Sequence, residues 1–493
     1  MWKCKKKVTI KLSAHLEGED QMKKPNVIFL LSDDHGAWAM GCAGNSEIRT
    51  PNLDRLAATG MRFENFFCTS PVCSPARASL ITGRIPSQHG VLDWLRDGNV
   101  GDDATEYLAG QTAYTDILAQ NSYACGISGK WHMGDSIKPQ KCLSHWYVHQ
   151  QGGGNYYNAP MIRDGQLINE PGYITDRITD DAIEYIQGHA GGDQPFYLSV
   201  HYTAPHSPWI DNHPKDIVDS YDDCPFNTCP QESLHPWRTS LTNEVMKDVH
   251  ENSKGYFAAV TAMDMNIGRI LDKLEKLGLK ENTLVCYMSD NGFNCGHHGV
   301  WGKGNATFPQ NMYDTSVKVP AIFSHPGHIP QGVVSDALVS GYDFMPTLLE
   351  YVDLENPEAD KLPGSSFSKI LLGIKEEARE NVVLYDEYGP VRMIRTKEWK
   401  YVHRYPYGPH ELYDMVNDPE ERTNLINEPE MESIIISMKA SLESWFVKYV
   451  DPAFDGTHEP VTGTGQLAMA GPAGKGKLAF AGDSTVAFTR NDG

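Results

Sequence analysis

The stretch that decides the fold is residues 26–34, NVIFLLSDD, a short continuous apolar run that ends in two acidic residues. Such a run is typical of a strand that is buried on both faces of a parallel sheet. Three further runs share this pattern and also lead into polar residues: 283–289 (TLVCYMS), 195–202 (PFYLSVHY) and 123–128 (YACGIS). They predict an α/β protein in which four strand ends meet at one crevice, because open α/β sheets place their sites at the carboxyl ends of strands. Periodicity alone does not distinguish an open, doubly wound sheet from a closed barrel.

The polar residues that follow two of these runs are candidate metal ligands. Asp33 and Asp34 follow the first run, and Asp290 and Asn291 follow the run at 283–289. Their side chains offer hard oxygen ligands, which favour Ca²⁺ or Mg²⁺ over Zn²⁺, and we expect Ca²⁺. A single Asp-Asp pair is more often a solvated turn or a helix cap. Two pairs, each directly after a buried strand, favour a metal site.

A second informative stretch is residues 71–83, PVCSPARASLITG. Pro75 suits the first turn of a helix and Gly83 suits the residue just past its end, so Cys73 would lie at the helix N-terminus. Arg77 is four residues further on and can lie on the same helical face as Cys73. Unpaired amides, the helix dipole and the guanidinium all favour an anion at this point. The alternative is a buried cysteine that only packs beside a helix start.

This stretch resembles the signature of the type I sulfatases, in which Cys-x-Pro-x-Arg is read by a maturation enzyme that oxidises the cysteine to formylglycine. The signature positions are matched by Cys73, Pro75, Arg77, Leu80, Thr82 and Gly83, while Ala76 replaces the usual serine. The resemblance implies that the aldehyde formed from Cys73 is hydrated to a diol, one oxygen of which attacks sulfur. It also implies an alkaline-phosphatase-like fold: a mixed, mostly parallel sheet flanked by helices, with a smaller C-terminal antiparallel sheet.

The same resemblance assigns roles to further residues. It implies that the divalent cation is bound by Asp33, Asp34, Asp290 and Asn291, with the formylglycine at Cys73 as a further ligand. Residues 128–134, SGKWHMG, resemble the second sulfatase signature, although Ser122 and Cys125 depart from it. Lys130 would then bind a sulfate oxygen, and His132 would take a proton from the diol as sulfate is expelled.

His206 and Lys303 also match sulfatase positions. They are candidates for binding the bridging oxygen and protonating the leaving group. The predicted catalytic set is therefore Cys73, Arg77, Lys130, His132, His206 and Lys303. His35, His297 and His298 are further candidates for lining the pocket, but the glycines beside the latter two are equally consistent with a loop.

Composition limits the partners of the protein. The chain of 493 residues has 64 acidic and 43 basic residues, a net charge of -21, which argues against a nucleic-acid partner or an anionic membrane surface. No apolar run approaches the length of a membrane span, and the N-terminal MWKCKKKVTIKL lacks the apolar core of a secretion signal. We therefore expect a cytoplasmic protein with reduced thiols. Cys224 and Cys229 could form a loop disulfide if the protein were exported.

Four regions differ in character along the chain. Residues 1–21 show no structural periodicity and are expected to be a disordered extension, with Met22 as an alternative start. Residues 22–375 form the predicted sulfatase catalytic domain. Residues 376–455 form a predicted C-terminal α+β subdomain, in which 391–405 alternate like a sheet edge. Residues 456–493, rich in Gly, Ala and Thr, are expected to be a flexible tail.

These patterns lead to a functional hypothesis with two alternatives. We expect a sulfuric ester hydrolase that requires a formylglycine-generating maturation enzyme as a partner. Residues 91–99 (VLDWLRDGN) and 146–158 (WYVHQQGGGNYYN) suit a sugar ring, so the expected substrate is a small or short oligosaccharide sulfate ester. The alternatives are a phosphonate or phosphate ester hydrolase of the same superfamily, and an unmodified, non-catalytic anion-binding protein.

Overall fold

The computed structural model describes residues 24–374 and 384–481. The extension predicted for residues 1–21 lies outside the described residues, as do the boundary predicted near residue 375 and the last part of the tail. Within the described ranges, no helix is both long enough and apolar enough to span a membrane.

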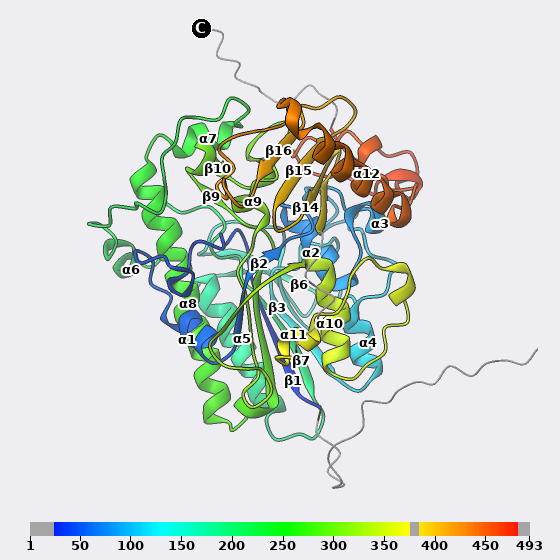
Figure 1. The fold of residues 1–493 in the computed structure, drawn as a ribbon. Helices are drawn as coiled ribbons and strands as arrows, with labels where there is room; N and C mark the ends of the chain where they lie inside the picture. The colour runs from blue at the N-terminus through cyan, green and yellow to red at the C-terminus, as the bar shows by residue number, and fades with distance from the viewer. Residues whose placement is uncertain (1–23, 375–383, 482–493) are drawn as a thin grey trace, which may run out of the picture.

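A ten-stranded mixed sheet forms the centre of the molecule (Figure 1). In spatial order its strands are β12 (Val333–Ser340), β2 (Met61–Phe67), β11 (Ala321–Ser324), β8 (Thr283–Ser289), β1 (Asn26–Ser32), β7 (Phe196–His201), β3 (Ala124–Gly129), β4 (His145–His149), β5 (Ala159–Arg163) and β6 (Gln166–Glu170). The four strands predicted from apolar runs are neighbours in the order β8-β1-β7-β3, and all pair in parallel. The sheet is open, which decides between the two architectures that periodicity left possible.

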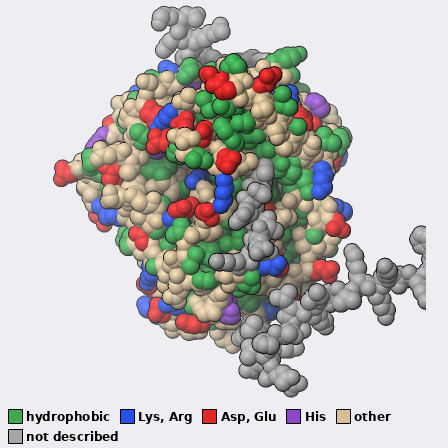
Figure 2. Space-filling model, in the orientation of Figure 1, with side chains coloured by type: hydrophobic (Ala, Val, Ile, Leu, Met, Phe, Trp, Pro, Cys, Tyr) green, Lys and Arg blue, Asp and Glu red, His purple; other side chains and the backbone are tan. Residues whose placement is uncertain are grey.

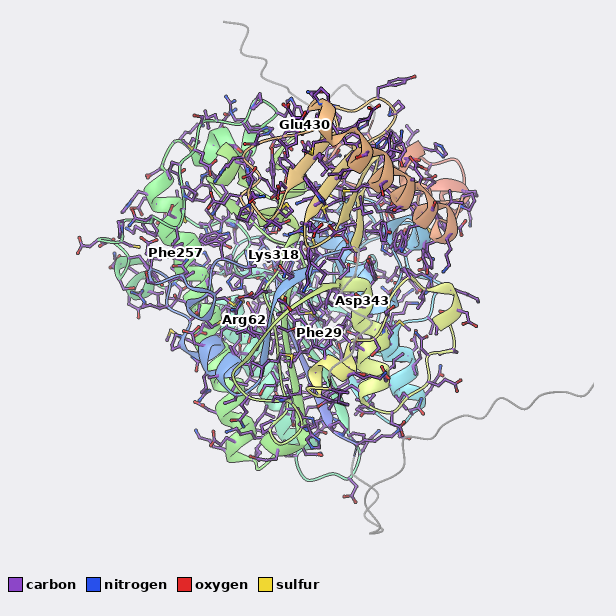
Figure 3. The ribbon with its side chains drawn as sticks, viewed as in Figure 1. Phe29, Arg62, Phe257, Lys318, Asp343 and Glu430 are labelled. Carbon is purple, nitrogen blue, oxygen red and sulfur yellow. The ribbon has the colours of Figure 1, made fainter. Side chains whose placement is uncertain are left out.

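Helices cover both faces of this sheet. Side chains along β1 alternate between the two faces, and both sets are apolar and need to be buried. Ile28 and Leu30 pack in one apolar cluster with residues of α1 (Pro51–Ala58), α5 (Ile174–His189) and α8 (Val249–Lys276). Val27, Phe29 and Leu31 pack on the other side with residues of α2 (Cys73–Thr82), α4 (Tyr114–Gln120), α10 (Phe344–Tyr351) and α11 (Ser368–Leu371). Figure 3 labels Phe29 in the middle of the sheet and Phe257 on α8, which belongs to a third apolar cluster.

Short elements occupy the connections. They include α3 (Pro86–His89), α6 (Lys215–Asp219), α7 (Ser240–Val245), α9 (Asp314–Val317) and the paired strands β9 (Asn294–Cys295) and β10 (Trp301–Gly302). On the face shown in Figure 2, acidic, basic and apolar side chains are interspersed.

The C-terminal part forms the predicted small antiparallel sheet. Its strands are β13 (Leu384–Tyr388), β14 (Val391–Arg395), β15 (Trp399–Arg404) and β16 (Glu411–Asp414), and α12 (Glu432–Tyr449) packs against β14 and β15. This sheet and α12 lie together beyond one end of the large sheet (Figure 1).

The flexible tail predicted from Gly456 onward is wrong for residues 456–481. Gln466 is fully buried and bridges Leu95 on one side and Phe480 on the other. Val461, Ala470 and Phe480 belong to the main apolar cluster. Composition failed here because a few apolar and amide side chains anchor an otherwise Gly- and Ala-rich segment.

Candidate active site

Four oxygen-bearing side chains meet at the ends of β1 and β8. Ser32 lies opposite Ser289 in the parallel pair, so Asp33 and Asp34 come next to Asp290 and Asn291. The three carboxylates are 0–3% exposed, and their oxygens lie within 4.8 Å of one another. The structure therefore brings together the residues predicted to bind a metal.

Each of these carboxylates has a cationic partner. Arg77 Nε lies 2.8 Å from Asp290 Oδ2, Lys130 Nζ contacts Asp33 Oδ2, and Lys303 Nζ contacts Asp34 Oδ1. Burial is the largest single influence and raises the pKa of Asp33 and of Asp34, but the nearby lysines and His206 together outweigh it and hold both pKa values below the usual 3.8. Both carboxyl groups are therefore ionised at neutral pH.

Asn291 shows that the cluster suits a cation. Its Nδ2 donates to Asp34 Oδ1 over 2.7 Å and to Gly292 O over 2.9 Å, whereas its Oδ1 is buried without a hydrogen-bond partner in the part of the chain that the structure describes. Buried polar atoms are normally hydrogen-bonded, so an orphaned oxygen beside ionised carboxylates fits a metal ligand. The donor set consists of oxygens only, which favours a hard divalent cation.

Cys73 is the first residue of α2, and its side chain faces the same cluster. Its Sγ lies 2.8 Å from Lys303 Nζ and 3.5 Å from Asp33 Oδ1. Burial, and then Asp33, raise the pKa of the Cys73 thiol to about 12, despite the nearby lysines. The unmodified thiol is thus protonated at neutral pH and is a poor nucleophile, because the thiolate is the reactive form.

His132 follows β3 and is held by a backbone carbonyl. Its Nε2 lies 3.0 Å from Leu95 O. Since a carbonyl only accepts, Nε2 carries the proton and Nδ1 is left as an acceptor, buried and without a partner within residues 24–374 and 384–481. Burial, reinforced by the charge of Lys130, holds the pKa of His132 well below 6.5, so the ring is neutral. His132 Nδ1 is therefore positioned to accept a proton.

His206 follows β7 and also lies beside the cluster. Its Nδ1 is 2.7 Å from Ser207 O and therefore donates to it. Its Nε2 lies 3.8 Å from Asp34 Oδ2, and the side chain is 26% exposed. The Nε2 atom of His206 therefore faces the cluster of carboxylates, while its Nδ1 is held by the backbone.

These groups line a cavity of about 310 Å³. Cys73, His132, His206 and Lys303 form its base, and the residues nearer the rim include Trp94, Arg96, Gln151 and Asn305. The rim residues come from the two loops that were predicted to suit a sugar ring and from the segment that carries Lys303. An aromatic ring beside amide and guanidinium groups is able to bind a polar ring such as a sugar.

Two glycines of the loop at 151–154 pack directly on the histidines, a feature that sequence reasoning missed. A Cβ at Gly152 would lie 2.1 Å from His132 Cε1, and one at Gly153 would lie 3.0 Å from His206 Nδ1. The sequence signal was the run of three glycines, which permits such a close approach of backbone to side chain.

Three other candidate histidines lie outside the cavity lining. His35 is buried, with its ring nitrogens bonded to Tyr287 OH and to Ala39 O. His298 stacks on Tyr313 at 3.8 Å, and His297 accepts a hydrogen bond from Cys295 N.

Cys224 and Cys229 are free thiols, so the loop disulfide that we expected only for an exported protein is absent from this structure.

The sulfatase family model matches residues 25–354, and a model of the C-terminal part of N-sulphoglucosamine sulphohydrolase matches residues 296–448. The chain belongs to the sulfatase family. This sulfatase is 28% identical to an N-acetylglucosamine-6-O-sulfatase of Bacteroides thetaiotaomicron, over 88% of each chain. It is 29% identical to an ulvan-active sulfatase of Formosa agariphila, over 89% of this chain and 83% of that protein.

Solved structures agree with this assignment. A protein in complex with its substrate D-glucosamine-2-N,6-O-disulfate gives a TM-score of 0.74 at 27% identity, covering 88% of this chain and 99% of that chain. A phosphonate monoester hydrolase of Agrobacterium radiobacter shares the fold, with a TM-score of 0.65 at 19% identity over 86% of this chain and 95% of that chain. The sulfatase thus has the predicted alkaline-phosphatase-like fold and is a sulfuric ester hydrolase.

Proposed function

We propose that this sulfatase removes sulfate from a carbohydrate sulfate ester, with a formylglycine made from Cys73 and a bound divalent cation, for which Ca²⁺ is the first candidate and Mg²⁺ the second. The observation that carries the proposal is the placement of Cys73: it is the first residue of α2, its Sγ lies beside Asp33 and Lys303, and it belongs to a Cys-x-Pro-x-Arg signature. Conversion of Cys73 to formylglycine would require a formylglycine-generating enzyme as a partner. Hydrated formylglycine would supply an oxygen nucleophile, and the cation would polarise the sulfate.

The protein's own residues have complementary tasks in this scheme. Asp33, Asp34, Asp290 and Asn291 would hold the cation together with residue 73. Lys130 and Lys303 are already beside Cys73 and its carboxylate neighbours, where their ammonium groups can bind sulfate oxygens. Arg77 fixes the site by binding Asp290 and the carbonyl of Lys130.

Two histidines would handle the protons. Neutral His132 would accept one at Nδ1, the buried atom that has no other partner in the described chain. His206 would donate one from Nε2 to the departing sugar oxygen, because its other nitrogen is committed to Ser207 O. Their different hydrogen bonds thus separate the base from the acid.

A carbohydrate substrate is supported by the rim of the cavity and by the relatives. Trp94, Gln151 and Asn305 offer a ring face and amide groups. One relative is named for N-acetylglucosamine 6-O-sulfate, another for ulvan, and the glucosamine disulfate complex has a similar fold.

The first test is the mass of the Cys73 peptide after expression with and without a formylglycine-generating enzyme. Conversion of the thiol to the aldehyde, together with sulfate release from a glucosamine 6-sulfate only in the converted sample, supports the proposal. An unconverted cysteine in a fully active enzyme would overturn it, and an unconverted, inactive protein that binds sulfate would favour the anion-binding alternative. Rates on a sulfate and a phosphonate monoester of the same alcohol test the remaining alternative.

A further inference from the structure

The chain beyond both family models packs against a loop that lines the cavity. The two models end at residues 354 and 448, yet the segment Val461–Ala468, here called the strap, runs beside the loop 90–96 that forms part of the cavity rim. Gln466, in the middle of the strap, is 0% exposed, although amide side chains are mostly found at the surface. A buried amide is stable only when its hydrogen bonds are satisfied, so its partners indicate what it holds.

Gln466 bonds to the loop 90–96 at several points. Its side-chain Oε1 accepts from Leu92 N at 2.8 Å and from Asp93 N at 3.4 Å, and its Nε2 donates to Gly90 O at 3.0 Å. Its backbone N donates to Trp94 O at 2.8 Å, and its backbone O accepts from Arg96 N at 3.0 Å. One residue therefore holds the loop along its whole length.

The loop in turn contacts the catalytic groups. Leu95 O is the carbonyl that binds His132 Nε2, and Leu95 N donates to Ser74 Oγ, next to Cys73, over 3.0 Å. Trp94, Leu95 and Arg96 line the cavity. A shift of this loop would therefore move the acceptor that orients His132 and would change the shape of the rim.

Two glycines near Gln466 form further hydrogen bonds to the loop 90–96 and to the segment beside it. Gly463 O accepts from Trp94 Nε1 at 3.1 Å and from Asn305 Nδ2 at 3.3 Å, and so links rim residues of two separate segments. Gly465 N donates to Asp93 Oδ2 at 3.1 Å. Gly465 has a φ of +105°, and a Cβ there would lie 2.9 Å from Arg96 Cβ, so this position requires glycine.

We propose that the strap is a positioning element of the active site, in which Gln466 acts through the loop 90–96 on His132 and on the Trp94–Arg96 rim. Gln466 touches neither the cavity base nor the reacting atoms, so it is a positioning residue. The kinetic consequences rest on the proposed function, whereas the hydrogen-bonding consequences do not.

The test compares Gln466→Met, which keeps the side-chain length and removes its hydrogen bonds, with Lys477→Met in the full-length, formylglycine-bearing protein. Lys477 is 71% exposed and its Nζ lies 3.5 Å from Asp103 Oδ1, away from the cavity lining. Hydrogen exchange is measured first. In Gln466→Met, the amides of residues 92–96 should exchange on the order of tenfold faster, while the core strand β1 stays protected and Lys477→Met matches wild type.

Steady-state kinetics on two esters supply the second measurement. Gln466→Met should lower kcat on the order of tenfold for both nitrophenyl sulfate and a glucosamine 6-sulfate, because His132 serves every substrate. KM should rise mainly for the sugar ester, which is the one that fills the rim. If kcat falls equally for both esters in proportion to the fraction of folded protein, and KM is unchanged, Gln466 only stabilises the fold.

Two outcomes keep the tests separable. Unchanged exchange at residues 92–96 in Gln466→Met would overturn the positioning role whatever the activity. If the wild type hydrolyses neither ester, the proposed function fails while the exchange result still decides on the strap. Gln466→Glu provides a second variant if Gln466→Met does not fold, since it keeps the size of the side chain and the acceptor for Leu92 N but loses the donor to Gly90 O. It should raise KM for the sugar ester, and an unchanged KM would overturn the role of the strap in the rim.

Discussion

Replacement of Gly152 by alanine should remove most of the activity by displacing one catalytic ring. The new methyl group would lie 2.1 Å from Cε1, 2.5 Å from Nε2 and 2.6 Å from Nδ1 of His132. Carbon atoms in contact are about 3.5–4.0 Å apart, so the ring must move by more than about 1 Å. Its 3.0 Å bond to Leu95 O would then break. A misplacement of about 1 Å at a catalytic group costs on the order of 10²-fold in rate, so we expect kcat to fall by about that factor.

Gly154→Ala is the matched control, because a Cβ there would meet only His149, at 3.7 Å. Both variants are assayed with nitrophenyl sulfate and a sugar sulfate, after mass spectrometry has shown equal conversion of Cys73. Overpacking in Gly152→Ala should also lower the free energy of unfolding by about 1–3 kcal/mol, which thermal unfolding measures. If Gly152→Ala keeps a kcat within about threefold of wild type, His132 is either free to adjust or not the base, and the assignment of that role is wrong.

Four further perturbations test separate parts of the site and fold. Cys73→Ala should fold normally but lose all turnover, since one small side chain contributes little to a core of this size, and any turnover above background contradicts the nucleophile assignment. Exhaustive chelation should abolish activity, with recovery on adding Ca²⁺ or Mg²⁺ but not Zn²⁺; recovery with Zn²⁺ alone would count against a site of hard oxygen ligands. His206→Ala should lower the rate on a sugar sulfate on the order of 10²-fold and affect nitrophenyl sulfate far less, because only the poor leaving group needs a proton; equal losses would mean that His206 merely positions substrate. In Asp314→Asn, the loss of the 2.8 Å ion pair with Lys400 should destabilise the fold by about 1–3 kcal/mol at pH 7. Burial alone would raise the pKa of Asp314, but Lys400 and Arg395 outweigh it and hold it well below 3.8, so the stability it contributes is present above pH 3.8 and is lost as the pH falls further. The difference from wild type in denaturant titrations should therefore shrink below pH 3.8, and a constant difference would contradict this.

Much of the site was predictable because its residues follow elements with strong local signals. The continuous apolar run of β1 reflects burial on both faces, and Asp33 and Asp34 come directly after it. The helix from Cys73 to Thr82 ends where Gly83 adopts a φ of 67°, as its sequence indicates. Parallel pairing then places the carboxyl ends of the strands at the same edge of the sheet, so the residues that follow them lie close together.

Other features had no local signal. His35 follows the first strand as closely as Asp34 does, yet its ring turns into the core, where Tyr287 OH and Ala39 O bind both nitrogens. His297 and His298 are close to Lys303 in the chain, but only Lys303 reaches the cavity. Which of several neighbouring polar side chains faces a cavity depends on partners from distant segments, and the spacing along the chain does not encode them.

The sequence by itself determined that the protein has an α/β sheet, though not whether the sheet is open or closed. It also determined the ligand type at the strand ends and the signature around Cys73. These features depend on residue type and on contacts within a few positions. The tertiary structure decided which ring nitrogen of each histidine is bound to the backbone: Nε2 of His132 to Leu95 O, and Nδ1 of His206 to Ser207 O. It also decided that Gln466 is buried and hydrogen-bonded to the loop 90–96, which the Gly- and Ala-rich composition around it did not indicate. Leu95 and Gln466 pair across more than three hundred residues of chain, and a hydrogen bond of that kind exists only once the rest of the fold has brought the two backbones together.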